Sequence, residues 1–237
     1  MKHYLMRSSG LIVTMLLAPV LLVGQSATPS ARVAGRVVSH AGVGVEDALV
    51  HVSAAPMPGI RAPFADTTRT RADGSFAFPQ VPTGRLRLCV HPEGKDLVGT
   101  CEWLPPLVVE GKDGETIRPE PIVLPEGHRL KVRVADARGF LDAGERSQAR
   151  RALVLGALAP HAPIVQFRPV RKTATDRDLE LVIPFDQDIQ LLLTASGYVV
   201  SAGAHGVANR AQSVKIPVRV DKGKPASDVV LTVTGVE

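Results

Sequence analysis

From Arg32 onward, short apolar runs alternate with turn signals, and almost no helical period is visible. The run 85–91 shows the pattern, because Leu86, Leu88 and Val90 recur at every second position, as on one face of a half-buried strand. Between two such runs, Asp73-Gly74 supplies the positive φ that a tight turn needs. Short strands at this spacing predict β-sandwiches.

The same pattern gives an expected order of elements. A loop is expected at 55–68, which contains several prolines, and the polar segment 141–151 is expected to form a loop or one helical turn. A cluster of prolines before Gly127 marks a domain boundary. The prediction is an all-β protein with two consecutive sandwiches, 31–124 and 126–237. The expected strands are 32–38, 48–54, 75–78, 85–91, 101–109, 115–124, 129–134, 152–158, 163–168, 178–184, 188–194, 213–220 and 227–234.

The N-terminus has the organisation of a secretory signal peptide. Lys2 and Arg7 precede an apolar run at 11–23, which is shorter than the roughly 20 residues of a spanning helix. Small residues before Ala27 predict cleavage after Ser26, so that 1–26 is removed. The alternative is an uncleaved membrane anchor. No later stretch is apolar for long enough to cross a membrane, and the mature protein is expected to be secreted or periplasmic.

Charge and composition exclude one large class of partner. The formal net charge is +5, and removing 1–26, which carries two basic residues and no acidic one, leaves an excess of three. That excess is scattered, and aromatic residues make up only 4% of the chain. Nucleic-acid binders gather basic residues on one face and often interleave aromatic ones. Nucleic acid is therefore not an expected partner.

The two cysteines, Cys89 and Cys101, are expected to form a disulfide because export brings them into an oxidising compartment. The bond closes a loop of about 13 residues, for which chain entropy predicts roughly 3 kcal/mol of stabilisation. A reactive thiol is the alternative, but His91 lies nearby without an evident orienting partner. Two cysteines alone are too few for structural zinc.

Three segments in the first half share a specific order and spacing. The segments are Val33-Ala34-Gly35-Arg36-Val37, Ala48-Leu49-Val50-His51-Val52 and Thr70-Arg71-Ala72-Asp73-Gly74-Ser75-Phe76-Ala77-Phe78-Pro79-Gln80-Val81-Pro82-Thr83-Gly84. With them, residues 31–124 resemble the carboxypeptidase regulatory-like domain, a transthyretin-like β-sandwich. The resemblance implies an accessory domain of carbohydrate-binding-like fold without a peptidase site, in which Phe76 and Phe78 belong to the scaffold. No family is recognised for 126–237.

The sequence contains no motif of a zincin, a nucleophile elbow, a dinucleotide loop or a phosphate loop. Its histidines lack metal-ligand spacing. The acidic pairs Asp176/Asp178 and Asp186/Asp188 share a face and suit calcium in principle, but solvated turns are the favoured interpretation. We therefore expect no catalytic residue, metal or cofactor, and no enzyme activity.

Two aromatic residues remain as candidates for ligand binding. Trp103 and Tyr198 are the only Trp and Tyr after residue 26. Trp103 is expected to pack against the disulfide or to form a sugar platform, and Tyr198 to begin a strand or to form such a platform. The leading hypothesis is an exported non-enzymatic interaction or scaffold protein with an envelope or extracellular protein partner. The alternatives are a carbohydrate-binding module for extracellular glycans and a hydrolase with an unrecognised site.

Overall fold

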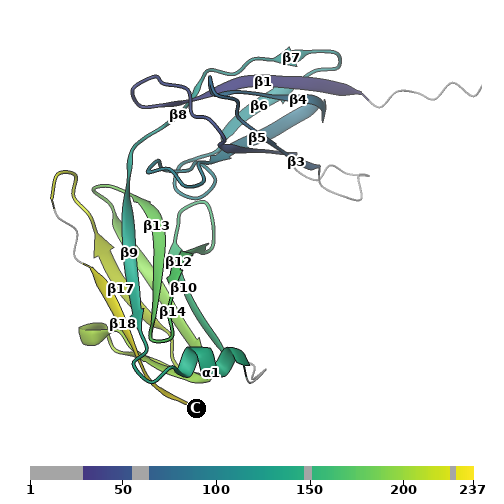
Figure 1. The fold of residues 1–237 in the computed structure, drawn as a ribbon. Coiled ribbons are helices and arrows are strands. Elements are labelled where there is room, and N and C mark those ends of the chain that lie inside the picture. Colours follow the sequence, from purple (N-terminus) through teal and green to yellow (C-terminus); the bar gives the residue numbers. More distant parts are fainter. Residues whose placement is uncertain (1–28, 55–63, 147–150, 225–227) are drawn as a thin grey trace, which may run out of the picture.

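The computed structural model describes residues 29–54, 64–146, 151–224 and 228–237 (Figure 1). The predicted signal peptide lies outside the described residues. Within them, no helix combines the length and the apolar character needed to cross a membrane. The described chain is almost entirely β-structure, as the alternating pattern predicts.

The first sandwich packs two four-stranded sheets around one core. In one sheet, β1 lies at the centre and pairs with β4, β7 and β8; the other has the order β3-β2-β5-β6. The strands are β1 (Ser30–Ser39), β2 (Leu49–Ala54), β3 (Ala65–Arg69), β4 (Ser75–Pro82), β5 (Gly84–His91), β6 (Leu107–Gly111), β7 (Thr116–Ile117) and β8 (Ile122–Leu124).

The second sandwich opposes a four-stranded sheet, β11-β10-β14-β17, to a six-stranded sheet, β12-β13-β9-β18-β15-β16. In Figure 1 it lies below the first sandwich, and helix α1 covers its far end. The elements are β9 (Gly127–Ala135), α1 (Phe140–Arg146), β10 (Ala152–Leu158), β11 (Val165–Gln166), β12 (Arg168–Lys172), β13 (Asp176–Pro184), β14 (Asp188–Ser196), β15 (Tyr198–Ser201), the 3-10 helix η1 (Gly203–His205), β16 (Val207–Ala208), β17 (Val214–Arg219) and β18 (Val229–Val236).

The predicted strand faces are confirmed. Leu86, Leu88 and Val90 are fully buried, and Phe76 and Phe78 lie edge to face with ring centroids 6.1 Å apart. Burial of alternate side chains is what holds two such sheets together. The predicted turn before β4 is also present, closed by a 2.8 Å hydrogen bond from the Gly74 amide to the Arg71 carbonyl, with Gly74 at φ +81°.

Some element predictions are wrong. The segment expected to be a loop at 55–68 ends in strand β3, which pairs with β2 along its whole length. The expected strand 101–109 begins only at Leu107, because the preceding residues form turns. Long-range pairing with β2 decides the first case. For the polar segment 141–151, the helical alternative is confirmed by α1, which is longer than the expected single turn. Its first amides donate hydrogen bonds to the buried Asp136 carboxylate at 3.0 and 2.7 Å, so a local cap starts the helix.

The turns between β5 and β6, residues 92–106, form what we term the clasp loop. Although this loop belongs in sequence to the first sandwich, its Val98 and Trp103 side chains are buried in the hydrophobic core of the second. They are 1% and 5% exposed. The clasp loop therefore joins the two sandwiches at a point separate from the covalent connection between β8 and β9 (Figure 1).

Polar contacts fix the same junction. The Val98 amide donates to the Pro125 carbonyl, and the Gly127 amide donates to the Asp96 carbonyl, both at 2.9 Å. Farther along the loop, the His161 amide donates to the Glu102 carbonyl at 3.0 Å. Contacts at both ends of the loop restrict rotation of one sandwich against the other.

The expected disulfide between Cys89 and Cys101 is present. It ties the clasp loop to β5, and the buried Thr100 hydroxyl reinforces the tie by accepting a 2.8 Å hydrogen bond from the Val90 amide. Since Cys101 lies two residues before Trp103, the bond holds the loop where its tryptophan enters the second core.

We expect Trp103→Ala to lower the free energy of unfolding by about 3–5 kcal/mol, the usual cost of emptying a buried aromatic site. Val108→Ala, at a side chain that is 42% exposed, should change it by less than about 0.5 kcal/mol. Urea denaturation followed by circular dichroism measures both. Equal effects of the two substitutions would contradict the role assigned to Trp103.

Replacing both cysteines by alanine should cost roughly 3 kcal/mol, because the unfolded chain regains the entropy of the closed loop. Dithiothreitol should produce a similar loss in the native protein and none in the double variant. Thermal unfolding with and without reductant provides the measurement. A native protein that is insensitive to full reduction, verified by thiol titration, would show that the bond does not stabilise the clasp loop.

Candidate functional site

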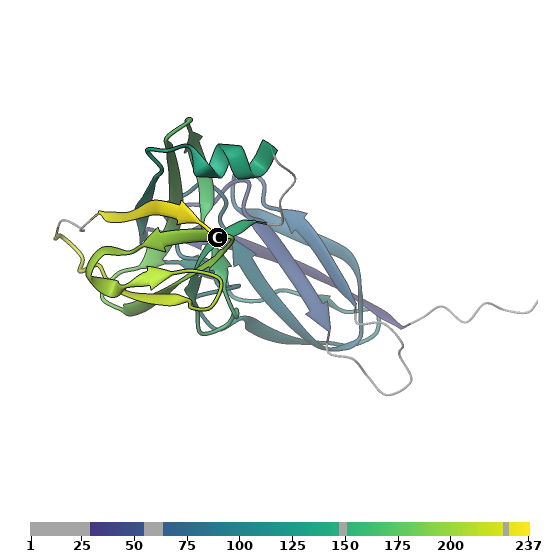
Figure 2. The ribbon, with the colours of Figure 1, turned by 90° about the horizontal axis from the view of Figure 1, so that it is seen from below.

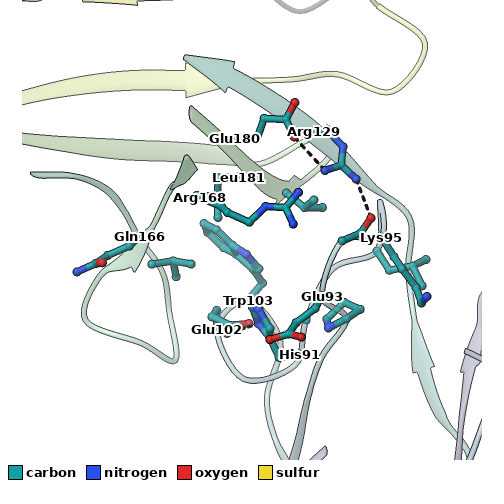
Figure 3. A pocket seen from close by; sticks show the side chains of 16 residues that line it. His91, Glu93, Lys95, Glu102, Trp103, Arg129, Gln166, Arg168, Glu180 and Leu181 are labelled. Carbon is teal, nitrogen blue, oxygen red and sulfur yellow. Dashed lines mark hydrogen bonds and ion pairs between the residues drawn. The ribbon is translucent and has the colours of Figure 1, made fainter. Parts of the chain in front are cut away.

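A cleft of about 360 Å³ lies where the two sandwiches meet. The clasp loop and the end of β5 form one wall, and residues of β9, β11, β12 and β13 form the other (Figure 3). Figure 2, seen from below, shows the first sandwich behind the second. Junctions between folded units are frequent positions for ligand sites. This cleft is therefore the candidate functional site.

On the first-sandwich side, His91 and Glu102 form a polar pair. The His91 Nδ1 atom lies 2.9 Å from the Glu102 Oε1 atom. The hydrogen bond to Glu102 raises the pKa of His91, although burial acts in the opposite direction. The neighbouring Glu93 carboxylate accepts a 2.8 Å hydrogen bond from Arg69, which lowers the pKa of Glu93.

Arg129 of β9 spans the junction from the second-sandwich side. Its guanidinium contacts Glu180 at 3.1 Å within its own sandwich and Asp96 of the clasp loop at 2.7 Å. It also donates a 3.1 Å hydrogen bond to the Gly94 carbonyl. Arg129 is thus fully engaged in holding the wall of the cleft, as Figure 3 shows.

Arg168 and Gln166 differ from Arg129 because no ion pair or side-chain hydrogen bond to a described residue holds them. Gln166 lies in β11 and Arg168 begins β12, the exposed edge strand of the six-stranded sheet. In Figure 3 the Arg168 side chain extends into the cleft, between Trp103 and Arg129. Neither residue is indicated by a sequence motif, because they meet the clasp loop only through the contact between the sandwiches.

The structure separates the two aromatic candidates. Trp103 lines the cleft but is 5% exposed, so its ring is part of the wall and not a flat open platform. Tyr198 begins β15 and is 3% exposed, in the core of the second sandwich. Its hydroxyl group faces Gly144 of α1, where an added Cβ would lie 2.0 Å from that oxygen. Burial raises the pKa of the Tyr198 phenol.

The disulfide borders a second surface hollow, which also includes His51 and Asp66. His51 pairs in register with Cys89 across β2 and β5. Burial is the main cause of the lowered pKa of His51, and electrostatic repulsion from the nearby His91 lowers it further. In the described part of the chain, no three His, Cys, Asp or Glu side chains are grouped as a metal site would require.

No family model matches the chain, and no curated protein matches its sequence. The resemblance of 31–124 to the carboxypeptidase regulatory-like domain therefore stays a prediction. Among solved structures, the chain is similar to the Bacillus anthracis TIE protein at 11% identity and a TM-score of 0.34, covering 86% of this chain and 34% of that one.

Two further similar structures are pilins. For a streptococcal ancillary pilin, the identity is 12%, the TM-score 0.38, and the coverage 88% of this chain and 63% of that one. For a minor pilin of Streptococcus agalactiae, the identity is 11% and the TM-score 0.35, and the match covers 88% of this chain and 97% of that one. The chain thus spans about a third of the first structure and less than two thirds of the second. The similarity is confined to β-sandwich architecture.

The His91–Glu102 pair makes the stability of the clasp loop dependent on pH. Because the folded-state pKa of His91 is raised above 6.5, its stabilising contribution is complete below that pH and is lost as the pH rises through the folded-state pKa. His91→Gln should therefore lower the free energy of unfolding more below about pH 6 than above about pH 8. Urea titrations across this range test the prediction, which a pH-independent effect of His91→Gln would contradict.

Proposed function

We propose that this protein is an exported, non-enzymatic interaction protein of the cell envelope or exterior, and that its ligand occupies the cleft between the sandwiches. The observation that carries the proposal is the clasp loop, whose Cys101 is bonded to β5 of the first sandwich while the flanking Val98 and Trp103 are buried in the core of the second. When both walls of a cleft are already ordered, ligand binding does not incur the entropy cost of ordering them.

The predicted signal peptide and the disulfide support an extracytoplasmic site of action. Disulfides persist in oxidising compartments and are rare in the cytosol. The resemblance of 31–124 to an accessory domain agrees with binding as the principal activity. Here the binding residues belong to both units, so neither sandwich would hold the ligand alone.

Binding of a glycan is the second candidate, and the composition of the cleft favours it. The edge of Trp103 and the side chain of Leu181 provide an apolar surface, and the Arg168 guanidinium and the Glu102 carboxylate provide polar groups beside it. Sugars present both kinds of surface. Trp103 would contribute to the floor of such a site, whereas the buried Tyr198 lies away from it.

The test is co-sedimentation of residues 27–237 with envelope fractions, namely peptidoglycan, insoluble polysaccharide and envelope membranes. Gln166→Trp fills the cleft from an exposed position and should weaken binding at least about tenfold. Lys215→Trp places the same ring at an exposed position of β17, outside the cleft, and should have no effect.

Both variants must first show the thermal stability of the native protein. Binding that survives Gln166→Trp would place the ligand elsewhere on the surface. Failure of the native protein to bind any of these fractions would contradict the proposed function.

A further inference from the structure

The charges of the cleft leave Arg168 without a carboxylate partner. The three acidic side chains of the cleft are each held by a base, since Glu93 pairs with Arg69, Glu102 with His91 and Glu180 with Arg129. Arg168 contributes to the lowered pKa of Glu93, mainly caused by the hydrogen bond from Arg69, but no carboxylate of the described residues lies within 4.0 Å of it.

The undescribed segments cannot supply the missing partner, because none of them contains an aspartate or a glutamate. The sequence has 23 acidic residues, and all of them lie in the described part of the chain. An arginine that extends into a cleft without an internal partner is a donor available to a ligand. Its planar guanidinium is suited to bidentate binding of a carboxylate.

We propose that the cleft binds a sugar carrying a single carboxylate, such as one uronic acid residue of an acidic glycan, with the carboxylate on Arg168. This inference rests on the proposed function and specifies its ligand. The Glu102 carboxylate offers acceptor positions to sugar hydroxyls. Trp103 and Leu181 offer an apolar surface to the ring carbons.

The net charge of the cleft favours one negative charge over two. Besides Arg168, the basic side chains of the cleft are Lys95 at the clasp loop, the engaged Arg129 and the titratable His91. Opposite them stand the three carboxylates already described. Lys95 also lacks an ion pair with a described residue, so it can add to the attraction of an anion. The three carboxylates repel a monoanion less strongly than a phosphate dianion.

The size of the cleft agrees with a single sugar residue. Its volume of about 360 Å³ lies at the lower end of the range of roughly 300–1,000 Å³ for ligand pockets. A longer acidic glycan would therefore place one residue in the cleft and continue outside it.

Tryptophan fluorescence tests the proposal directly, because Trp103 is the only tryptophan and lies in the wall of the cleft. The probes are glucuronate, glucose and glucose 6-phosphate at equal ionic strength. Glucuronate should change the emission in a saturable way and bind at least about tenfold more tightly than either other sugar.

Arg168→Gln should weaken glucuronate binding at least about tenfold. The matched control is Arg171→Gln in the same strand β12, whose arginine pairs with Asp178 and does not line the cleft. It should leave binding unchanged. Absence of a glucuronate response, equal binding of glucose, or unchanged binding by Arg168→Gln would each overturn the proposal, and stronger binding of glucose 6-phosphate would replace the carboxylate by a phosphate ligand.

Comparison with the co-sedimentation experiment separates the two proposals. If Gln166→Trp abolishes envelope binding but glucuronate neither binds nor competes, the cleft is the site and its ligand is not an acidic sugar. If glucuronate binds through Arg168 but no envelope fraction is bound, the ligand chemistry is supported and the envelope role fails. Competition of envelope binding by glucuronate would support both.

Discussion

Insertion of the clasp loop into the core of the second sandwich is the contact on which the arrangement of the whole chain depends. Trp103 and Val98 belong to the first sandwich in sequence but bury their apolar surface in the core of the second. Two sandwiches joined by a single connection would move independently, which is the usual behaviour of linked domains. The clasp loop restricts that motion because it is a second attachment between the sandwiches. The disulfide bonds the loop to Cys89 of β5.

The same contact creates the cleft. Because the clasp loop lies beside β9 and β13, its polar residues face those of the second sandwich across the cleft. Arg129 bonds to both walls and neutralises Asp96 and Glu180. The acidic groups of the cleft are consequently engaged in structure, whereas Arg168 has no carboxylate partner among the described residues. The proposed site depends on how the two units meet, since each contributes only one of its walls.

Two edge strands of the second sandwich carry residues that act against pairing with a second copy of the chain. The edge strand β12 carries Pro169, a register irregularity beside it and three basic residues. The edge strand β17 carries Pro217. Proline removes a ladder donor, and positive charges repel a second copy. Arg168 belongs to this protected edge, so its position serves the solubility of the sheet as well as the cleft.

The all-β class, the strand faces, the turn at Asp73-Gly74 and the cysteine pair could be predicted from the sequence alone. Alternation, turn chemistry and redox compartment are local or compositional properties. The sequence also singled out Trp103, but on the assumption of a strand through Cys101, which the structure replaces by turns. The Asp136 cap of helix α1 is local, since it lies four and five residues before the amides that it binds. Strand β3 and the meeting of Arg168 with the clasp loop depend instead on residues far apart in the chain. Tertiary contacts alone determine them, because pairing or packing with a distant segment leaves no periodic signal in the local sequence.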